Sequence, residues 1–141
     1  MAAVFTAALI ARHSDKAVSV NGEKTDNGAE VIQYVFQSKD HQKWNLEATT
    51  GEYYVVRAVH SQKAMSVNGE STANGAKILQ WQWETKPHQE WRLVQKDNGY
   101  FALQNRNSNL FLSVDGESTD NSAALVQWPG GDQPHQQFRL G

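Results

Sequence analysis

Short runs of apolar, β-branched and aromatic residues alternate with turn-rich stretches along the whole chain. In the middle of the sequence, runs of four to six such residues occupy Tyr53–Ala58, Ala64–Val67, Lys77–Trp81 and Glu90–Val94. The stretch Asn68–Gly75, between the second and third runs, is rich in Asn, Gly, Ser and Thr. Runs of this length bounded by turn residues are typical of β-strands. No segment shows the sustained 3.6-residue period of an amphipathic helix, so the pattern predicts an all-β protein.

The same pattern occurs three times, at a spacing of 47 residues. The segment Ser19-Val20-Asn21-Gly22-Glu23 returns at 66–70 and, with Asp in place of Asn, at 113–117. Because the 141 residues are three times 47 and no insertion separates the copies, the chain divides into repeats 1–47, 48–94 and 95–141. A fixed period of this length indicates a supersecondary unit that buries its apolar face only against its neighbours. We therefore predict a single domain, residues 1–141.

Four strands in each of three repeats give twelve strands. Two architectures suit this arrangement, a three-bladed propeller and a closed barrel with capping hairpins. Propellers usually have at least four blades, whereas a barrel closes its sheet edges. We therefore expect a β-trefoil, in which three equivalent lobes surround a pseudo-three-fold axis.

Composition and charge exclude several classes of protein. With 15 acidic and 13 basic residues the net charge is -2, so the chain lacks a basic surface and we expect no nucleic-acid partner. The absence of cysteine excludes disulfides and fits a reducing compartment. The apolar start Ala2–Ala11 has no positively charged stretch before it, is too short to span a bilayer, and aligns with Tyr53–Ala58. We interpret it as a strand, and expect a cytoplasmic or leaderless secreted protein without membrane insertion.

A Gln-x-aromatic element closes each repeat. It occurs as Gln42–Trp44, Gln89–Trp91 and Gln136–Phe138, and it resembles the QxW motif of ricin B-type lectin domains. The upstream segments Ser66–Trp81 and Ser113–Trp128 resemble the same family, so the resemblance covers the whole chain. It implies a β-trefoil that binds galactose or N-acetylgalactosamine and has no enzymatic activity. In that family the glutamine hydrogen-bonds backbone beneath its lobe, and the aromatic fills the bottom of the barrel.

In each repeat one aromatic residue ends the third strand, before a loop that varies between copies. These residues are Tyr34, Trp81 and Trp128. A ring at such an edge can stack on the apolar face of a sugar while nearby polar groups fix its hydroxyls. The alternative is that the rings cover the interior. With the polar residues near them, the candidate carbohydrate-binding residues are Ser19, Asn21, Tyr34, His41 and Gln42 in the first lobe; Ser66, Asn68, Trp81, His88 and Gln89 in the second; and Ser113, Asp115, Trp128, His135 and Gln136 in the third.

The chain departs from the family's polar contacts at the same three positions in every repeat. A serine stands where the family has an aspartate at the end of the second strand, a histidine replaces the asparagine before the QxW glutamine, and Ile32, Leu79 and Val126 replace a glutamine of the third strand. A serine makes weaker and fewer contacts with sugar hydroxyls than a carboxylate does. Asp115 makes the third lobe the best able to recover the lost contact. Either the pockets recognise a ligand differently, or they are not sugar pockets.

The repeated histidines and glutamates allow other interpretations. The histidines can contact a ligand, form local hydrogen bonds, or bind a metal at the axis, but their spacing gives no local pair of metal ligands. We expect no metal and no cofactor. Glu23, Glu70 and Glu117 are single carboxylates, whereas glycoside hydrolysis needs two across one bond. We interpret them as solvated turn residues and predict no catalytic residue.

These observations predict a multivalent lectin, an agglutinin that cross-links glycans on glycoproteins or glycolipids. The alternative is a trefoil that binds proteins, such as a protease inhibitor. The loops at Gln82–Pro87 and Pro129–Pro134, which differ between copies, keep this alternative open. A homodimer is also open, because closure of the strand edges leaves the outer surfaces free to pair.

Overall fold

Antiparallel strands form most of the regular structure in residues 4–141, the part of the chain that the computed structural model describes. The strands are β1 (Val4–Ala7), β2 (Leu9–Ala11), β3 (Ala17–Val20), β4 (Val31–Tyr34), β5 (Trp44–Ala48), β6 (Tyr53–Ala58), β7 (Ala64–Val67), β8 (Ile78–Trp81), β9 (Glu90–Gln95), β10 (Phe101–Asn105), β11 (Phe111–Val114), β12 (Leu125–Trp128) and β13 (Phe138–Leu140). Six 3₁₀ turns lie between them: η1 (Asn21–Glu23), η2 (Asp40–Gln42), η3 (Asn68–Glu70), η4 (Pro87–Gln89), η5 (Asp115–Glu117) and η6 (Pro134–Gln136). The prediction of an all-β protein is confirmed.

The first strand of the first lobe is interrupted. Residues 4–141 contain thirteen strands rather than the predicted twelve, because β1 and β2 together occupy the place of one strand. Ala8, between them, exchanges two backbone hydrogen bonds with Gly141, of 3.2 and 2.9 Å. The strand predicted at Ala2–Ala11 is therefore confirmed as two short segments, and Ala2 and Ala3 lie outside the described residues.

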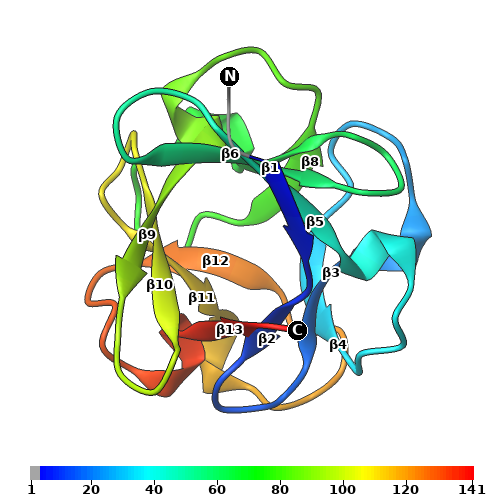
Figure 1. Ribbon diagram of the computed structural model, residues 1–141, viewed down its shortest axis with the longest axis vertical. Coiled ribbons are helices and arrows are strands. Elements are labelled where there is room, and N and C mark those ends of the chain that lie inside the picture. Colours follow the sequence, from blue (N-terminus) through cyan, green and yellow to red (C-terminus); the bar gives the residue numbers. More distant parts are fainter. Residues whose placement is uncertain (1–3) are drawn as a thin grey trace.

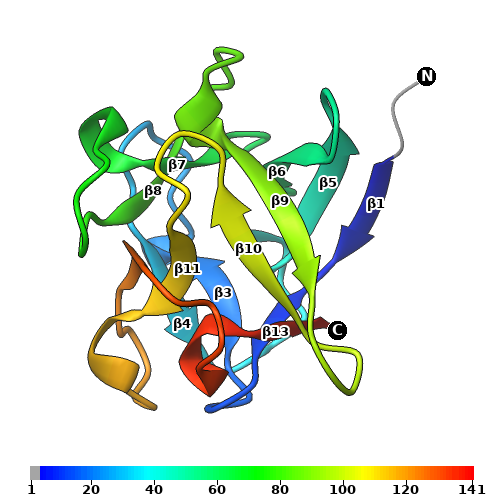
Figure 2. The same cartoon turned by 90° about the vertical axis from the view of Figure 1, so that its left-hand side faces the viewer.

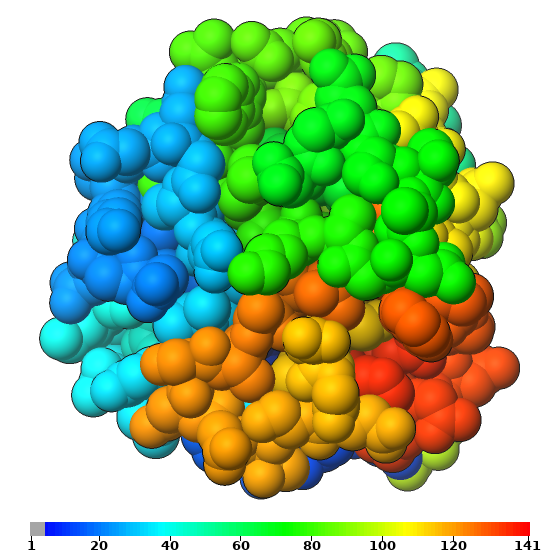
Figure 3. All heavy atoms as spheres, turned by 180° about the vertical axis from the view of Figure 1, so that it is seen from behind, coloured from blue at the N-terminus to red at the C-terminus, as the bar shows by residue number. Residues whose placement is uncertain are grey.

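The strands close into a barrel capped by three hairpins (Figure 1). The continuous pairing order is β1-β5-β6-β9-β10-β13-β2, and the chain through Ala8 joins its two ends. The hairpins β3–β4, β7–β8 and β11–β12 extend from this ring (Figure 2). Bridges at Glu30–Leu79, Ile32–Ala124 and Lys77–Val126 link each hairpin to the next, so the three hairpins meet on one face, in blue, green and orange in Figure 3.

The aromatic residues of the QxW elements fill the interior, as expected. Trp44, Trp91 and Phe138 are fully buried in one hydrophobic cluster. The indole N–H groups of Trp44 and Trp91 donate to backbone carbonyls, both at 2.9 Å, so their one polar atom is satisfied. Burying each ring stabilises the fold by about 1.5–3 kcal/mol. These positions are structural.

A buried glutamine on the third strand ties each lobe to the turn of the preceding lobe. The side-chain amide of Gln80 donates to the carbonyls of Lys24 and Asp26, both at 2.9 Å, and its oxygen accepts the hydroxyl of Ser61 at 2.8 Å. Gln33 and Gln127 make the equivalent contacts with the third and second lobes. Because buried amides need such partners, these bonds fix the turns that border the pockets described next.

Candidate functional site

Each lobe carries one pocket, between the turn after its second strand and the loop before its QxW element. The pocket of the first lobe (the first site) is lined by Ser19, Val20, Asn21, Gly22, Glu23, Ile32, Tyr34, Gln37, Lys39 and His41. The second site is lined by Ser66, Val67, Asn68, Gly69, Glu70, Leu79, Trp81, Glu84, Lys86 and His88, and the third by Ser113, Val114, Asp115, Gly116, Glu117, Val126, Trp128 and His135. Their volumes of about 420, 380 and 310 Å³ are in the range of small-molecule sites, roughly 300–1,000 Å³.

The structure brings together four of the five residues that the sequence analysis selects in each lobe. The serine, the Asn or Asp two residues later, the aromatic and the histidine all line the pocket. The fifth, the glutamine of the QxW element, does not. Gln42, Gln89 and Gln136 are fully buried beneath the pocket wall.

The buried glutamine shapes the wall from below. In the second site, Nε2 of Gln89 donates to the carbonyl of Gln82 at 2.8 Å and to Oγ of Ser66 at 3.2 Å. Its Oε1 accepts the backbone N–H of Glu84 at 2.9 Å. Gln42 and Gln136 make the same three kinds of contact in their lobes. The glutamine therefore positions both the loop and the serine.

The serine hydroxyl is already engaged within the protein. Oγ of Ser66 donates to the carbonyl of Ala64 at 2.8 Å while it accepts from Gln89. Ser19 and Ser113 donate in the same way, both at 2.9 Å. A hydroxyl has one proton and two acceptor positions. Each serine therefore offers a ligand no proton and one acceptor position.

The aromatic rings are accessible, unlike those of the core. Trp81 is 37% exposed and Trp128 is 48% exposed, and Tyr34 is partly exposed. A Cβ placed on Gly28 would lie 3.8 Å from Cζ3 of Trp81, so the indole lies against the turn of the preceding lobe. Trp128 lies against Gly75 in the same way, at 3.9 Å. Each indole is thus supported from outside its own lobe.

A buried histidine faces a glutamate in every site. The distance from Nδ1 of the histidine to Oε1 of the glutamate is 3.8 Å for His41 and Glu23, 3.8 Å for His88 and Glu70, and 3.9 Å for His135 and Glu117. Burial lowers the pKa of all three histidines, and the nearby glutamate partly opposes this shift. The imidazoles are therefore neutral at neutral pH.

Each pocket also contains a glutamate that the sequence pattern indicated only as a solvated turn residue. Glu23, Glu70 and Glu117 line the three pockets, and their backbone φ angles are +56°, +57° and +56°. Each follows a glycine that also has positive φ. Left-handed backbone is uncommon for residues with a side chain. Its occurrence at the same position of all three lobes therefore distinguishes this glutamate from an ordinary turn residue. The signal in the sequence was the Asn/Asp-Gly-Glu triplet present in all three copies.

A lysine accompanies the glutamate in two of the three sites. Nζ of Lys86 is 3.2 Å from Oε2 of Glu70, and Nζ of Lys39 is 3.7 Å from Oε2 of Glu23. In the third repeat the equivalent residue is Gln133, which carries no charge. The third site therefore has the more negative wall, to which Asp115 adds a second carboxylate.

In residues 4–141, no three His, Cys, Asp or Glu side chains come together in a way that would hold a metal ion. In that same part of the chain, no helix is long and apolar enough to cross a bilayer. The 141 residues contain no cysteine.

Comparison with known proteins identifies the family. The sequence matches the family described as "Ricin-type beta-trefoil lectin domain-like" over residues 6–81 and 87–141. Among solved structures it is similar to ThreeFoil, a designed three-fold symmetric protein, with 38% identity and a TM-score of 0.94 over 96% of each chain.

Two further solved structures share the fold at lower identity. An exo-β-1,3-galactanase from Clostridium thermocellum is 24% identical, with a TM-score of 0.93 over 96% of this chain and 29% of the galactanase chain. The Macrolepiota procera ricin B-like lectin, solved in complex with lactose, is 18% identical, with a TM-score of 0.82 over 96% of this chain and 94% of that one. No curated protein sequence matches significantly. The predicted β-trefoil fold is thus confirmed, and the chain belongs to the ricin-type β-trefoil lectin domain-like family.

Proposed function

We propose that the protein is a multivalent lectin that binds galactose- or N-acetylgalactosamine-type glycans and cross-links the molecules that carry them. One observation carries this proposal: three equivalent pockets each combine an exposed aromatic ring with a polar wall. In the second site, Trp81 lines the pocket together with Glu70 and His88. In the third site Trp128 lines the pocket with the same two residue types, and in the first site Tyr34 takes the place of the indole.

This pairing suits a sugar. The indole presents an apolar surface to the C–H groups of a pyranose ring, while polar side chains set its orientation through the hydroxyls. A galactoside has an apolar face of this kind. The Macrolepiota procera lectin, which has the same fold, was solved with lactose, and this supports a galactoside as the first ligand to test.

The number of sites determines how strongly such a protein binds a surface. A single shallow site binds weakly, because association has entropic and desolvation costs. Three sites on one rigid barrel gain roughly a hundredfold or more in avidity where the glycan spacing fits. We expect agglutination of glycan-coated cells or beads and no cleavage of the glycan, because the sugar is held and not transformed.

Removal of two platforms tests this function. The double variant Trp81→Ala/Trp128→Ala should lose agglutination of lactose-coated beads, because one remaining site cannot cross-link. Trp83→Ala is a matched control, since Trp83 lies beside Arg57, lines none of the three pockets and is also a tryptophan. Normal agglutination by the double variant would show that these rings are not the platforms.

A glycan array separates the lectin from the protein-binding alternative. We expect the wild-type chain to bind terminal galactose or N-acetylgalactosamine on the array. Binding to no glycan, together with capture of a defined protein partner, would instead favour a protein-interaction module that uses the loops 82–87 and 129–134.

A further inference from the structure

We propose that Glu23, Glu70 and Glu117 are the carboxylates that accept the ligand's hydroxyl protons. The histidine of the same lobe acts as a positioning residue for each. This inference rests on the proposed function and names the polar contact of that same site. It assigns a binding role to residues that look like solvated turn residues in the sequence.

The serine at the end of the second strand has little hydrogen-bonding capacity left for a ligand. Its proton is donated to the carbonyl two residues earlier, as from Ser66 to Ala64, and one acceptor position is occupied by the QxW glutamine. A carboxylate, in contrast, has about four acceptor positions on two oxygens. The site therefore needs another residue to accept two neighbouring hydroxyls.

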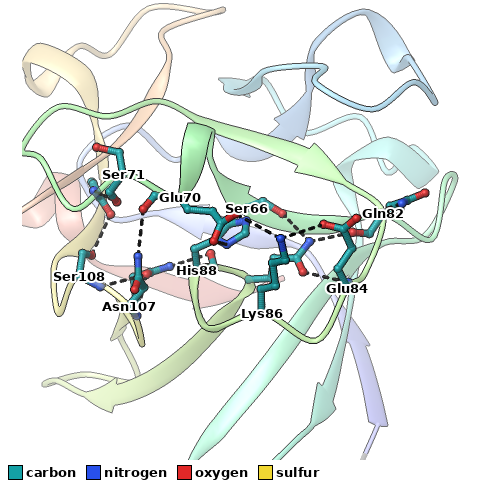
Figure 4. Close-up of polar contacts among 12 residues, drawn as sticks. Ser66, Glu70, Ser71, Gln82, Glu84, Lys86, His88, Asn107 and Ser108 are labelled. Atoms are coloured by element: carbon teal, nitrogen blue, oxygen red, sulfur yellow. Dashed lines mark hydrogen bonds and ion pairs between the residues drawn. The ribbon is translucent and has the colours of Figure 1, made fainter.

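The glutamate lies where such an acceptor is needed. It lines the same pocket as the aromatic ring, and its side chain remains 59%, 55% and 73% exposed in Glu23, Glu70 and Glu117. Figure 4 shows Glu70 beside His88 and Ser66 in the second site. The left-handed backbone, which side chains disfavour, is kept at this residue in all three lobes. Backbone held in such a conformation is frequent at ligand-binding positions.

The histidine supplies the second, independent observation. Nδ1 of His88 and Nδ1 of His135 are buried and have no hydrogen-bond partner. Buried polar atoms without a partner are rare. Oε1 of the glutamate lies 3.8 and 3.9 Å from these two nitrogens. A small rotation of the glutamate side chain would bring its oxygen into hydrogen-bond range of a protonated Nδ1, and the second oxygen would stay free for the ligand.

The lysines do not block this role. Lys86 contacts the other oxygen of Glu70, Oε2, at 3.2 Å, and it lies 4.0 Å from Glu84. An exposed ion pair of this kind is weak and uses only part of the carboxylate's acceptor capacity. In the third site no lysine takes this place, and Glu117 is the most exposed of the three glutamates.

The ligand chemistry follows from this arrangement. A carboxylate beside an aromatic ring suits a neutral pyranose that presents two adjacent hydroxyl donors while its apolar face lies on the ring. In the third site, where no lysine lines the pocket beside Glu117 and Asp115, it disfavours sugars that carry a carboxylate or sulfate at the same edge, because like charges repel. We therefore expect neutral galactosides to bind in preference to their anionic derivatives.

An isosteric substitution tests the carboxylate. The triple variant Glu23→Gln/Glu70→Gln/Glu117→Gln keeps the side-chain shape, and we expect its affinity for lactose, measured by isothermal titration calorimetry, to fall at least about tenfold, as expected for loss of a charge-assisted contact. The control Glu30→Gln/Glu47→Gln/Glu52→Gln changes the net charge equally, and none of its residues lines a pocket. It should bind lactose as the wild type does.

A second series tests the positioning role. Replacing His41, His88 and His135 by Asn keeps an N–H donor near Nδ1, whereas replacement by Leu removes it. We expect the Asn variant to retain most of the lactose affinity and the Leu variant to lose as much as the Gln variant does. A merely structural histidine would not be rescued by Asn in this way. Thermal melting of each variant shows that the barrel is intact.

The outcomes are distinguishable. If the wild-type chain binds lactose and the Glu→Gln variant binds it equally well, the carboxylate assignment is overturned and the lectin function stands. Equal losses in the Asn and Leu variants would overturn the positioning role. A wild-type chain that binds no glycan at all would overturn the proposed function itself.

Discussion

The first site differs from the second and third in its aromatic ring and in the residue behind that ring. Trp81 lies against Gly28 and Trp128 against Gly75. The equivalent residue of the third lobe is Ser122, whose N–H bonds the strand that ends at Tyr34. The backbone contact is the same in each case: the N–H groups of Gly28, Gly75 and Ser122 donate to the carbonyls of Gln80, Gln127 and Gln33, all at 2.8 Å. At this contact, the lobes therefore differ in one turn side chain and in the size of one ring.

This comparison shows that one turn serves two sites. The turn of the first lobe places Glu23 in the first site and Gly28 behind the platform of the second site. The turn of the third lobe places Glu117 in the third site and bonds Ser122 to Gln33, beside the aromatic residue of the first site. The larger ring, an indole, thus occurs where the turn residue of the neighbouring lobe is glycine, and the smaller ring of Tyr34 occurs where it is Ser122. The identity of each platform is therefore linked to a residue of another lobe.

The largest effect is expected from adding a side chain behind an indole. Gly28 has a φ of +91°, so Gly28→Ala should lower the free energy of unfolding by about 1–2 kcal/mol through backbone strain. The new Cβ itself fits, at 3.8 Å from Cζ3 of Trp81, but relaxation of the strained turn would move the support of that ring, so lactose binding at the second site should also weaken. Urea unfolding and calorimetry measure the two effects.

The matching variant in the other region is Ser122→Ala. Ser122 already carries a Cβ at a φ of +74°, so this change should alter stability by less than about 0.5 kcal/mol. Equal costs for Gly28→Ala and Ser122→Ala would contradict the explanation given for the difference between the two regions.

A smaller effect is expected from converting the first site to the form of the others. In a background with Trp81→Ala and Trp128→Ala, the pair Tyr34→Trp/Ser122→Gly should strengthen lactose binding several-fold, because indole offers a larger stacking surface. Calorimetry on this one-site protein gives the affinity. Tyr34→Trp alone should gain less than the pair does, and an equal gain would show that Ser122 does not influence the platform.

The smallest effect is expected from acid. The lowered pKa of His41, His88 and His135 means that the unfolded chain takes up protons at a higher pH than the folded chain does. The stability from these neutral imidazoles is complete above about pH 6.5 and declines as the pH falls through the lowered pKa. The melting temperature should therefore fall between pH 7 and pH 5.

Lobes should differ in this response. The rings of His60 and His13 lie 6.1 Å from those of His41 and His135, and each pair makes protonation of the pocket histidine more costly. For His88, the residue of the neighbouring repeat that corresponds to His13 and His60 is Asn107. The variants His60→Asn and His13→Asn should therefore show a shallower fall of the melting temperature with pH. An unchanged slope would show that the pairs do not contribute.

The fold was predictable from the sequence because the repeat constrains it directly. Three copies without insertions specify three equivalent lobes, and alternating runs and turns located strands such as Tyr53–Ala58 and Ala64–Val67 with their observed bounds. The burial of Trp44 and Trp91 also followed, from the resemblance of the Gln-x-aromatic element to the QxW motif.

The polar wall was only partly predictable. Glu70 follows a turn glycine, and sequence alone does not show that a left-handed backbone turns it toward His88. Gln89 was selected as a pocket residue, but it satisfies backbone groups under the wall instead, since both roles demand the same amide. The contact between Gly28 and Trp81 joins residues of different lobes, and no local pattern indicates it.

Because of contacts between lobes, the order in which the sites become complete during synthesis differs from their order along the chain. All residues that line the first pocket are present once His41 has been added. The backbone on both sides of Tyr34, however, gains its support only when Asn121, whose Oδ1 accepts the N–H of Val35 at 3.0 Å, and Ser122 have been joined to the chain. The second site draws on residues between Lys24 and Asn107, which are made earlier. The pocket that comes first in the sequence is therefore finished after the second, and a chain that stops before residue 121 carries every residue lining the first pocket without the support of the backbone beside Tyr34.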